Sequence, residues 1–251
     1  MSDFDRNYAA ATRGVGADRA VIDAGLRAYM IRIYNYMAMG VALTGVVAWI
    51  TYNAAVNEVG GKLVLTSFGQ MIFSGPAVLV LFLGTLGMVI LISWRIDRLQ
   101  PATALALFMV YAGLLGLMLS SIFLTYTGTS ITRVFFISAA SFAGLSLYGY
   151  TTQRDLSPIG SFLMMGLIGL IIAMVVNIFL KSSGLDFVIS AVGVLIFAGL
   201  TAWDTQKIKE MYDPMEDGTI VGRKAVMGAL TLYLDFINLF LFLLRLFGDR
   251  R

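Results

Sequence analysis

The feature that most constrains this chain is a series of apolar runs, each close to the roughly 20 residues that a helix needs to cross a bilayer core. Only 13% of the residues are charged, against about 25% in a soluble domain, and the charges lie almost entirely between the runs. The mean hydropathy is +0.84. The sequence therefore predicts an all-α, polytopic membrane protein with seven transmembrane helices, at residues 30–52, 76–94, 101–124, 131–150, 157–181, 186–204 and 226–248.

The segments outside these runs divide the chain into two parts. Residues 1–28 are polar and are expected to form an N-terminal tail, while residues 29–251 form the seven-helix domain. No apolar run precedes residue 28, so we expect no cleavable signal peptide. Residues 53–75 are a polar and mixed connector. In the fourth run, Ala140 and Gly144 form a pair of small residues that favours close helix approach.

Cysteine and histidine are both absent. Their absence excludes disulfides, thiolate metal sites, haem ligation and histidine-based catalysis, and we expect neither a resident cofactor nor an enzyme. Sensing of pH near neutrality must then come from carboxyl groups, since histidine is the usual switch. The chain has no basic run interleaved with aromatic residues, so we expect the lipid bilayer and no nucleic acid as its surroundings.

The distribution of Lys and Arg predicts the orientation, because cytoplasmic loops are enriched in them. With a cytoplasmic N-terminus, 12 of these residues lie inside and three lie outside. The inner set is Arg6, Arg13, Arg19, Arg27, Arg32, Arg95, Arg98, Arg154, Lys207, Lys209, Arg223 and Lys224, and the outer set is Lys62, Arg133 and Lys181. The tail with Arg245, Arg250 and Arg251 breaks the rule if the last segment crosses fully, and obeys it if that segment dips in and returns. The sequence leaves both arrangements open.

The last apolar run carries one carboxylate, Asp235, near its middle. An aspartate at a helix centre costs roughly 2.5 to 3.5 kcal/mol, and each Leu, Ile or Phe returns about 0.3 to 0.6, so the run still inserts. The polar residues share one helical face, which should turn toward other helices or water. This polar stripe consists of Gly228, Thr231, Asp235, Asn238 and Arg245. An acid at this depth is a candidate functional residue, although a packing role satisfied by a neighbouring donor is the alternative.

A second acid, Asp204, lies near the inner end of the sixth run. It is either an interfacial acid that pairs with Lys207 or Lys209, or the partner of Asp235. The two helices are consecutive and antiparallel, so the acids would meet a little below the middle of the membrane. Two carboxylates in a low dielectric cannot both ionise cheaply, so the pair would share a proton and titrate as a unit. The same oxygens suit Ca²⁺, which would compete with protons.

A basic residue should compensate the ionised pair. Arg98 and Arg95 follow the second run on the inner side, and an arginine can hold a carboxylate in a bidentate contact. The alternative for either arginine is anchoring at the membrane surface alone.

Several motifs resemble the transmembrane Bax inhibitor motif family, in its bacterial branch, over roughly residues 25–251. They are LYGYTTQRDLS at 147–157, GLIGLII at 166–172, AWDTQKIK at 202–209 and ALTLYLDFINLFL at 229–241. The resemblance implies six helices around a central seventh, a di-aspartyl sensor at Asp204 and Asp235, and an arginine latch at Arg98, with Arg95 as second choice. Some relatives carry a glutamate in the second helix, and Gly87 lies near that place here. The basic tail at 247–251 also resembles some relatives.

The resemblance implies a pH-sensitive calcium leak channel of the bacterial inner membrane, gated by Asp204, Asp235 and Arg98, and the acid pair is consistent with it. The alternative is a regulatory protein that binds a membrane protease or another partner without conducting ions. An intramembrane aspartyl protease also needs two acids on adjacent helices, but its Gly-x-Gly-Asp motif is missing, since Leu232-Tyr-Leu precedes Asp235.

Overall fold

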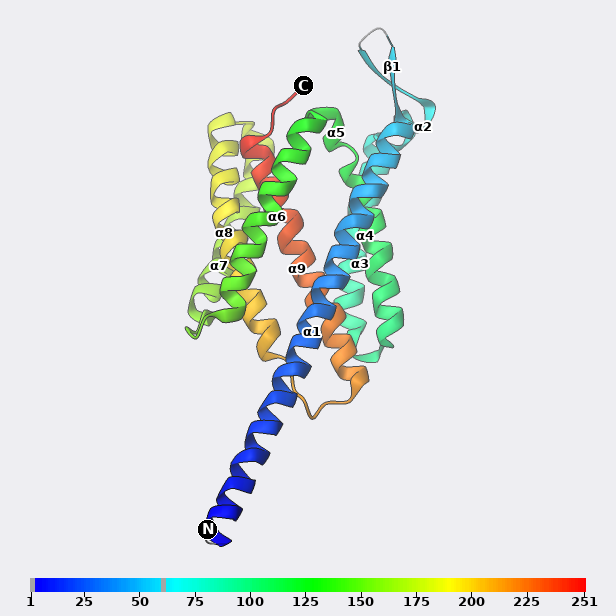
Figure 1. Cartoon of the computed structure of the whole chain (residues 1–251). Helices are drawn as coiled ribbons and strands as arrows, with labels where there is room; N and C mark the ends of the chain where they lie inside the picture. Colours follow the sequence, from blue (N-terminus) through cyan, green and yellow to red (C-terminus); the bar gives the residue numbers. More distant parts are fainter. Residues whose placement is uncertain (1–2, 60–61) are drawn as a thin grey trace.

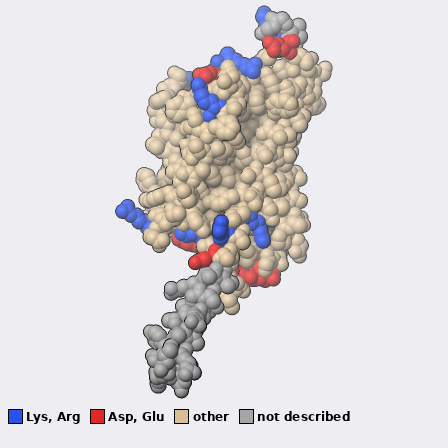
Figure 2. Space-filling model, in the orientation of Figure 1, with Lys and Arg blue, Asp and Glu red and all other residues tan. Residues whose placement is uncertain are grey.

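The computed structural model describes residues 3–59 and 62–251, with side chains from Ile22 to Glu58 and from Lys62 to Arg251. Within this part of the chain, seven helices are long and apolar enough to cross a membrane, which confirms the predicted all-α fold and all seven spans. On the face shown in Figure 2, charged residues gather at the two ends of the molecule and none lies between them. The long helices are α1 (Asp3–Ala55), α3 (Gly75–Arg95), α4 (Pro101–Leu119), α6 (Gly128–Thr151), α7 (Ser157–Leu180), α8 (Ser183–Glu210) and α9 (Gly218–Phe247).

Two features of the first third of the chain differ from the sequence prediction. The helix α1 is continuous from Asp3 to Ala55, without a break where the polar tail was expected to end. The connector contains a hairpin of β1 (Val56–Val59) and β2 (Lys62–Leu65), followed by α2 (Ser67–Ile72). Each strand has only four residues, too few for a periodic pattern to stand out, so the sequence analysis did not find the hairpin.

The helices form two groups of three with α9 between them (Figure 1). The first half-bundle contains α1, α3 and α4, and the second contains α6, α7 and α8. Helix α9 packs against α1 and α4 on one side and against α6 and α8 on the other. Of an 18-residue apolar stretch of α9, 72% is buried, compared with 6% for the corresponding stretch of α7 and 11% for that of α3. The predicted central position of the last helix is therefore confirmed.

Close crossings in the second half-bundle occur where glycine faces a neighbouring helix. A Cβ atom at Gly149 of α6 would lie 2.1 Å from the carbonyl oxygen of Ala202 in α8, and one at Gly160 of α7 would lie 2.1 Å from the Trp203 ring. In contrast, a Cβ at Gly144 would meet nothing within 4 Å. The small pair Ala140 and Gly144 was therefore the wrong choice for this crossing, which lies one turn further along α6.

The C-terminus lies at the opposite end of the molecule from the N-terminus (Figure 1). Helix α9 crosses completely, so the arrangement in which the last segment returns is excluded. The basic tail is held by partners on that side: Asp249 forms an ion pair with Arg133 at 2.9 Å, and Arg250 approaches Asp186 at 3.8 Å.

The tail also ties together segments that are distant in sequence. The backbone nitrogen of Arg251 donates to the carbonyl of Thr125, at the end of the short helix α5 (Ile122–Thr125). The backbone nitrogen of Asp249 donates to the Ser130 hydroxyl at the start of α6. The C-terminal end of α9 is thereby fastened to the α5–α6 turn.

Candidate functional site

Asp204 and Asp235 line one cavity of about 580 Å³ beside the central helix, which we call the aspartate cavity. Its wall comes from α8 and α9 on the polar side and from apolar residues of α3 and α7 on the other, including Leu86 and Met164. Helices α3 and α7 belong to different half-bundles and are not packed against each other along their length. The cavity therefore lies at a gap in the ring of helices around α9.

The two carboxyl groups line the same cavity and are near enough to act on each other electrostatically. Asp235 is only 5% exposed, and its Oδ2 atom is buried without a hydrogen-bond partner. Asp204 is half-buried. A buried carboxylate without a partner is costly, so the arrangement favours one proton, or a cation, between the two groups.

The alternative partners of Asp204 are engaged elsewhere. Lys207 lies over the Trp203 ring, with Nζ 5.0 Å from its centroid, and Lys209 donates to the Tyr150 carbonyl at 2.9 Å. Among the residues that the structure describes, neither lysine forms an ion pair with Asp204. Lys207 is nevertheless near enough to act on Asp204 electrostatically.

Arg98 does not lie beside the pair in this conformation. It is exposed at the end of a short 3₁₀ helix, η1 (Ile96–Arg98), that packs near the start of α9. The next residue, Leu99, accepts a hydrogen bond from Arg223 at 2.6 Å. Twelve residues separate Arg223 from Asp235, which corresponds to about 18 Å of helix rise. Arg95 is also exposed, so the latch role of either arginine stays a prediction.

The polar stripe of α9 was recognised in the sequence, and four of its five residues line the aspartate cavity: Thr231, Asp235, Asn238 and Arg245. The fifth, Gly228, packs against Ile208 and Ile33. The Asn238 amide nitrogen donates to the Leu234 carbonyl at 2.8 Å, and the Thr231 hydroxyl donates to Met227 at 3.1 Å. The donors are thus used within α9, and the remaining side-chain oxygens are available to the cavity.

Hydrogen bonds on the opposite side of α9 were not foreseen. The hydroxyl of Tyr233 pairs with that of Thr44 in α1 at 2.6 Å, and Thr44 donates to the Ala112 carbonyl in α4 at 2.9 Å. Similarly, Ser146 joins Tyr34 at 2.7 Å and Thr205 at 2.9 Å. Single hydroxyl residues inside apolar runs are the only signal for such contacts, and they do not reveal which helix will be the partner.

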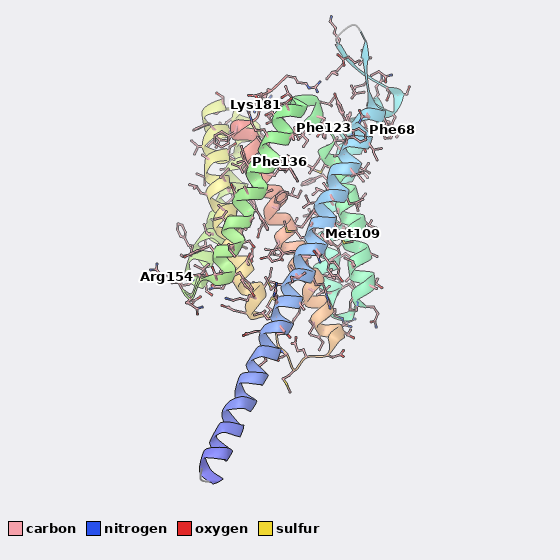
Figure 3. The ribbon with its side chains drawn as sticks, viewed as in Figure 1. Phe68, Met109, Phe123, Phe136, Arg154 and Lys181 are labelled. Atoms are coloured by element: carbon pink, nitrogen blue, oxygen red, sulfur yellow. The ribbon has the colours of Figure 1, made fainter. Side chains whose placement is uncertain are left out.

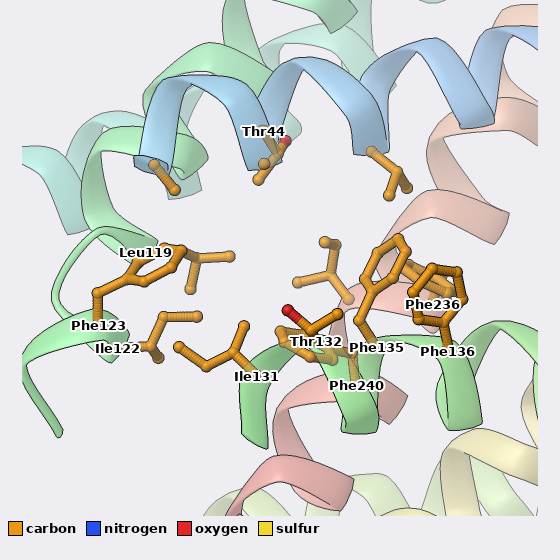
Figure 4. Close-up of a pocket in the computed structure, with 14 residues that line it drawn as sticks. Thr44, Leu119, Ile122, Phe123, Ile131, Thr132, Phe135, Phe136, Phe236 and Phe240 are labelled. Atoms are coloured by element: carbon orange, nitrogen blue, oxygen red, sulfur yellow. The ribbon is translucent and has the colours of Figure 1, made fainter. Parts of the chain in front are cut away.

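A second cavity, of about 310 Å³, lies between α1 and α6 (Figure 4). We call it the aromatic cavity, because Phe135, Phe236 and Phe240 form much of its wall. Its two hydroxyl residues, Thr44 and Thr132, both donate to backbone carbonyls. Among the residues with described side chains, no charged residue lines it, so it has no charged group to offer an ion.

Basic residues lie at both ends of α7, as expected for a helix that crosses a membrane. Arg154 and Lys181 lie at opposite ends of α7 (Figure 3).

In the described residues, no group of three or more Asp, Glu, His or Cys side chains could hold a metal ion. The two carboxyl groups of Asp204 and Asp235 supply at most four of the six to eight oxygens that Ca²⁺ takes as ligands.

The fold and the site define a class: a multi-pass helical membrane protein with a central helix that carries a buried acid. Residues 26–251 match the family described as inhibitor of apoptosis-promoting Bax1, and the chain belongs to this Bax inhibitor family. It is 49% identical over 229 residues to an uncharacterised protein of Rickettsia prowazekii, covering 91% of this chain and 92% of that one. It is 44% identical over 231 residues to the inner membrane protein YbhL of Escherichia coli, covering 91% and 94%. A protein of Caulobacter vibrioides is 44% identical over the full length of both chains.

Proposed function

We propose that this protein is a pH-sensitive leak channel for Ca²⁺ in the bacterial inner membrane, with Asp204 and Asp235 as its proton sensor. The observation that carries the proposal is the placement of both carboxyl groups in one cavity, near enough to act on each other and without an ion-pair partner among the described residues. The inner-membrane location follows the E. coli relative, which is an inner membrane protein.

In this proposal, protons and Ca²⁺ compete for the same oxygens. With one shared proton the pair carries a single negative charge, and after its loss the two carboxylates repel each other and attract a divalent cation. Because Asp235 belongs to the central helix, a change in this repulsion acts on the contacts of α9 with both half-bundles. Arg98 would have to move toward the pair to act as a latch.

Calcium flux into proteoliposomes tests the proposal. The parent chain should admit Ca²⁺ at a rate that depends on pH, because the coupled pair titrates as a unit. Asp235→Asn should remove this dependence. Asp97→Asn, which alters an exposed aspartate outside the cavity, is the matched control and should behave as the parent. Identical pH-dependent flux in Asp235→Asn, or parent liposomes no more permeable than empty ones, would overturn the proposal.

A second proposal is a regulatory role toward a membrane protease or another membrane protein. The first part of α1 extends beyond the ends of the other helices (Figure 1), and the family match begins only at residue 26. Deleting residues 1–24 should then abolish the cellular effect of the protein while Ca²⁺ flux remains. An unchanged cellular effect would contradict this role. We propose no catalysis by the aspartate pair, since the Gly-x-Gly-Asp motif is missing.

A further inference from the structure

Arg245 lies at the end of the aspartate cavity nearest the C-terminus of α9, which is the outer end for the cytoplasmic N-terminus that the sequence predicts. It belongs to the last turn of α9, is exposed, and lines the same cavity as Asp204 and Asp235. Ten residues separate it from Asp235, which corresponds to about 15 Å of helix rise, and Asn238 lies between them. A positive charge at the mouth therefore faces the same space as the acids at the inner part.

The surroundings hold the guanidinium near the cavity wall. Its central carbon is 5.5 Å from the centroid of the Phe242 ring, which also lines the cavity. Phe242 is fixed in turn, because it stacks on Phe197 at 5.7 Å and fills the space over Gly193.

No described acid neutralises Arg245. The ion pairs of the described residues number three, and Arg245 belongs to none of them. The acids at this end of the molecule have other partners: Asp249 pairs with Arg133, and Asp186 with Arg250. The charge of Arg245 therefore acts on whatever moves through the outer part of the cavity.

We propose that Arg245 is a charge barrier at the outer mouth of the aspartate cavity, which slows cations and favours anions on the way to Asn238 and the acid pair. As a statement about Ca²⁺ flux, it rests on the proposed channel function. As a statement about access to the cavity, it does not.

Another role for Arg245 is stabilisation of the helix end. A basic residue in the last turn interacts favourably with the helix dipole and anchors the helix at the membrane surface. If Arg245 only stabilises the helix end, its charge should not affect how fast ions reach Asn238, two turns earlier in α9. The accessibility of Asn238 to charged reagents therefore separates this role from the charge barrier.

The chain has no cysteine, so Asn238→Cys provides a single reactive thiol in the cavity. We would measure its modification, in the full chain in liposomes at low ionic strength, by a cationic and by an anionic methanethiosulfonate reagent of similar size. Replacing Arg245 with Gln in this background should raise the ratio of cationic to anionic rates at least about fourfold, for a charge about 10 Å away in water. Arg245→Lys should keep the original ratio, and so should Arg251→Gln, which alters a basic residue outside the cavity. An unchanged ratio in Arg245→Gln overturns the barrier.

Calcium flux supplies the second measurement. Arg245→Gln should raise the initial rate about fourfold, because a divalent ion senses twice the potential of a univalent one, while Arg245→Lys and Arg251→Gln match the parent. Unchanged flux in Arg245→Gln, together with a pH response that Asp235→Asn removes, overturns the barrier and leaves the channel proposal standing. A changed labelling ratio with no flux in any variant supports the barrier and overturns the channel proposal.

Discussion

The aspartate cavity and the aromatic cavity lie on different sides of the same helix, α9, and differ in what they offer to an ion. The aspartate cavity has polar side chains at successive turns of α9, from Thr231 to Arg245. The aromatic cavity has five phenylalanines and two hydroxyls that already donate to backbone carbonyls. Moving a charge into an apolar site without partners costs many kcal/mol. The comparison indicates that only the first cavity can serve a cation, while the second suits packing and lipid.

The difference between the two cavities is tested most strongly by asking whether the pH dependence of Ca²⁺ flux depends on Asp204 and Asp235. We expect Asp204→Asn and Asp235→Asn each to remove the pH dependence of Ca²⁺ flux, and the double variant to add nothing, because coupled groups titrate together. One pKa unit of coupling corresponds to about a tenfold change in the balance of protonation states. Flux assays at a series of pH values measure this effect.

The matched control lies in the other cavity. Phe240→Leu alters the aromatic cavity on the same helix and should leave the pH response of flux intact. Two results would show that the two sides of α9 are not distinct in function. Either Asp204→Asn and Asp235→Asn each halve the pH response of the flux and their effects add, or Phe240→Leu abolishes this response.

The close packing of α6 against α8 can be tested at the point where the two helices cross. Gly149→Ala places a Cβ atom against the Ala202 carbonyl, so the helices must move apart, at a cost of about 1–3 kcal/mol in unfolding free energy. Gly144→Ala in the same helix meets nothing within 4 Å and should be neutral or stabilising, since alanine favours a helix by about 0.5–1 kcal/mol over glycine. Thermal unfolding in detergent measures both; equal effects would contradict the crossing.

The hydroxyl contacts on the aromatic side should stabilise the position of α9. Thr44→Val removes the partner of the buried Tyr233 hydroxyl and the bond to Ala112, so we expect a loss of about 1–3 kcal/mol in unfolding free energy. Thr132→Val, in the same cavity, removes only a bond to Gly128 within its own helix and should change stability by less than about 0.5 kcal/mol. Thermal unfolding of the two variants measures the contrast, and comparable losses would argue against a special role for Thr44.

The smallest expected effect concerns the start of α9, below both cavities. The side chain of Asp217 accepts from the Thr219 backbone at 3.2 Å, and its hydrogen bonds with Thr219 hold the pKa of this carboxyl below its usual range. A carboxyl group whose pKa is lower in the folded state stabilises the fold at pH values above its pKa in the unfolded chain. This contribution is lost as the pH falls through the pKa of the folded state. We therefore expect the first turn of α9 to weaken below about pH 4.

Hydrogen exchange of the first amides of α9 measures this change. Asp217→Asn keeps a capping side chain without a charge and should make the protection factors of these amides independent of acid pH, whereas Asp217→Ala should lower the protection factors at every pH. Protection in Asp217→Ala equal to that of the parent would show that the cap does not matter.

Much of the fold was predictable because its signals are local. Each of the seven spans is an apolar run of sufficient length, and bilayer crossing requires little more than length and hydropathy. The polar stripe of α9 was also predictable, since the spacing of Thr231, Asp235, Asn238 and Arg245 reflects only the helical repeat. Even the strong candidacy of Asp235 follows from one charge in an apolar run.

The sequence by itself thus determined that the helices cross the membrane and that one of them carries an acidic, polar face. Only the tertiary structure decided what that face meets: a cavity shared with Asp204 and Arg245, rather than Arg98, which lies near the start of α9. It also decided that Gly149, and not Gly144, meets α8, and that the tail pairs with Arg133 and Asp186. The physical reason is that hydropathy and helical period act within a few residues, whereas partners depend on side chains brought together from helices far apart in the chain.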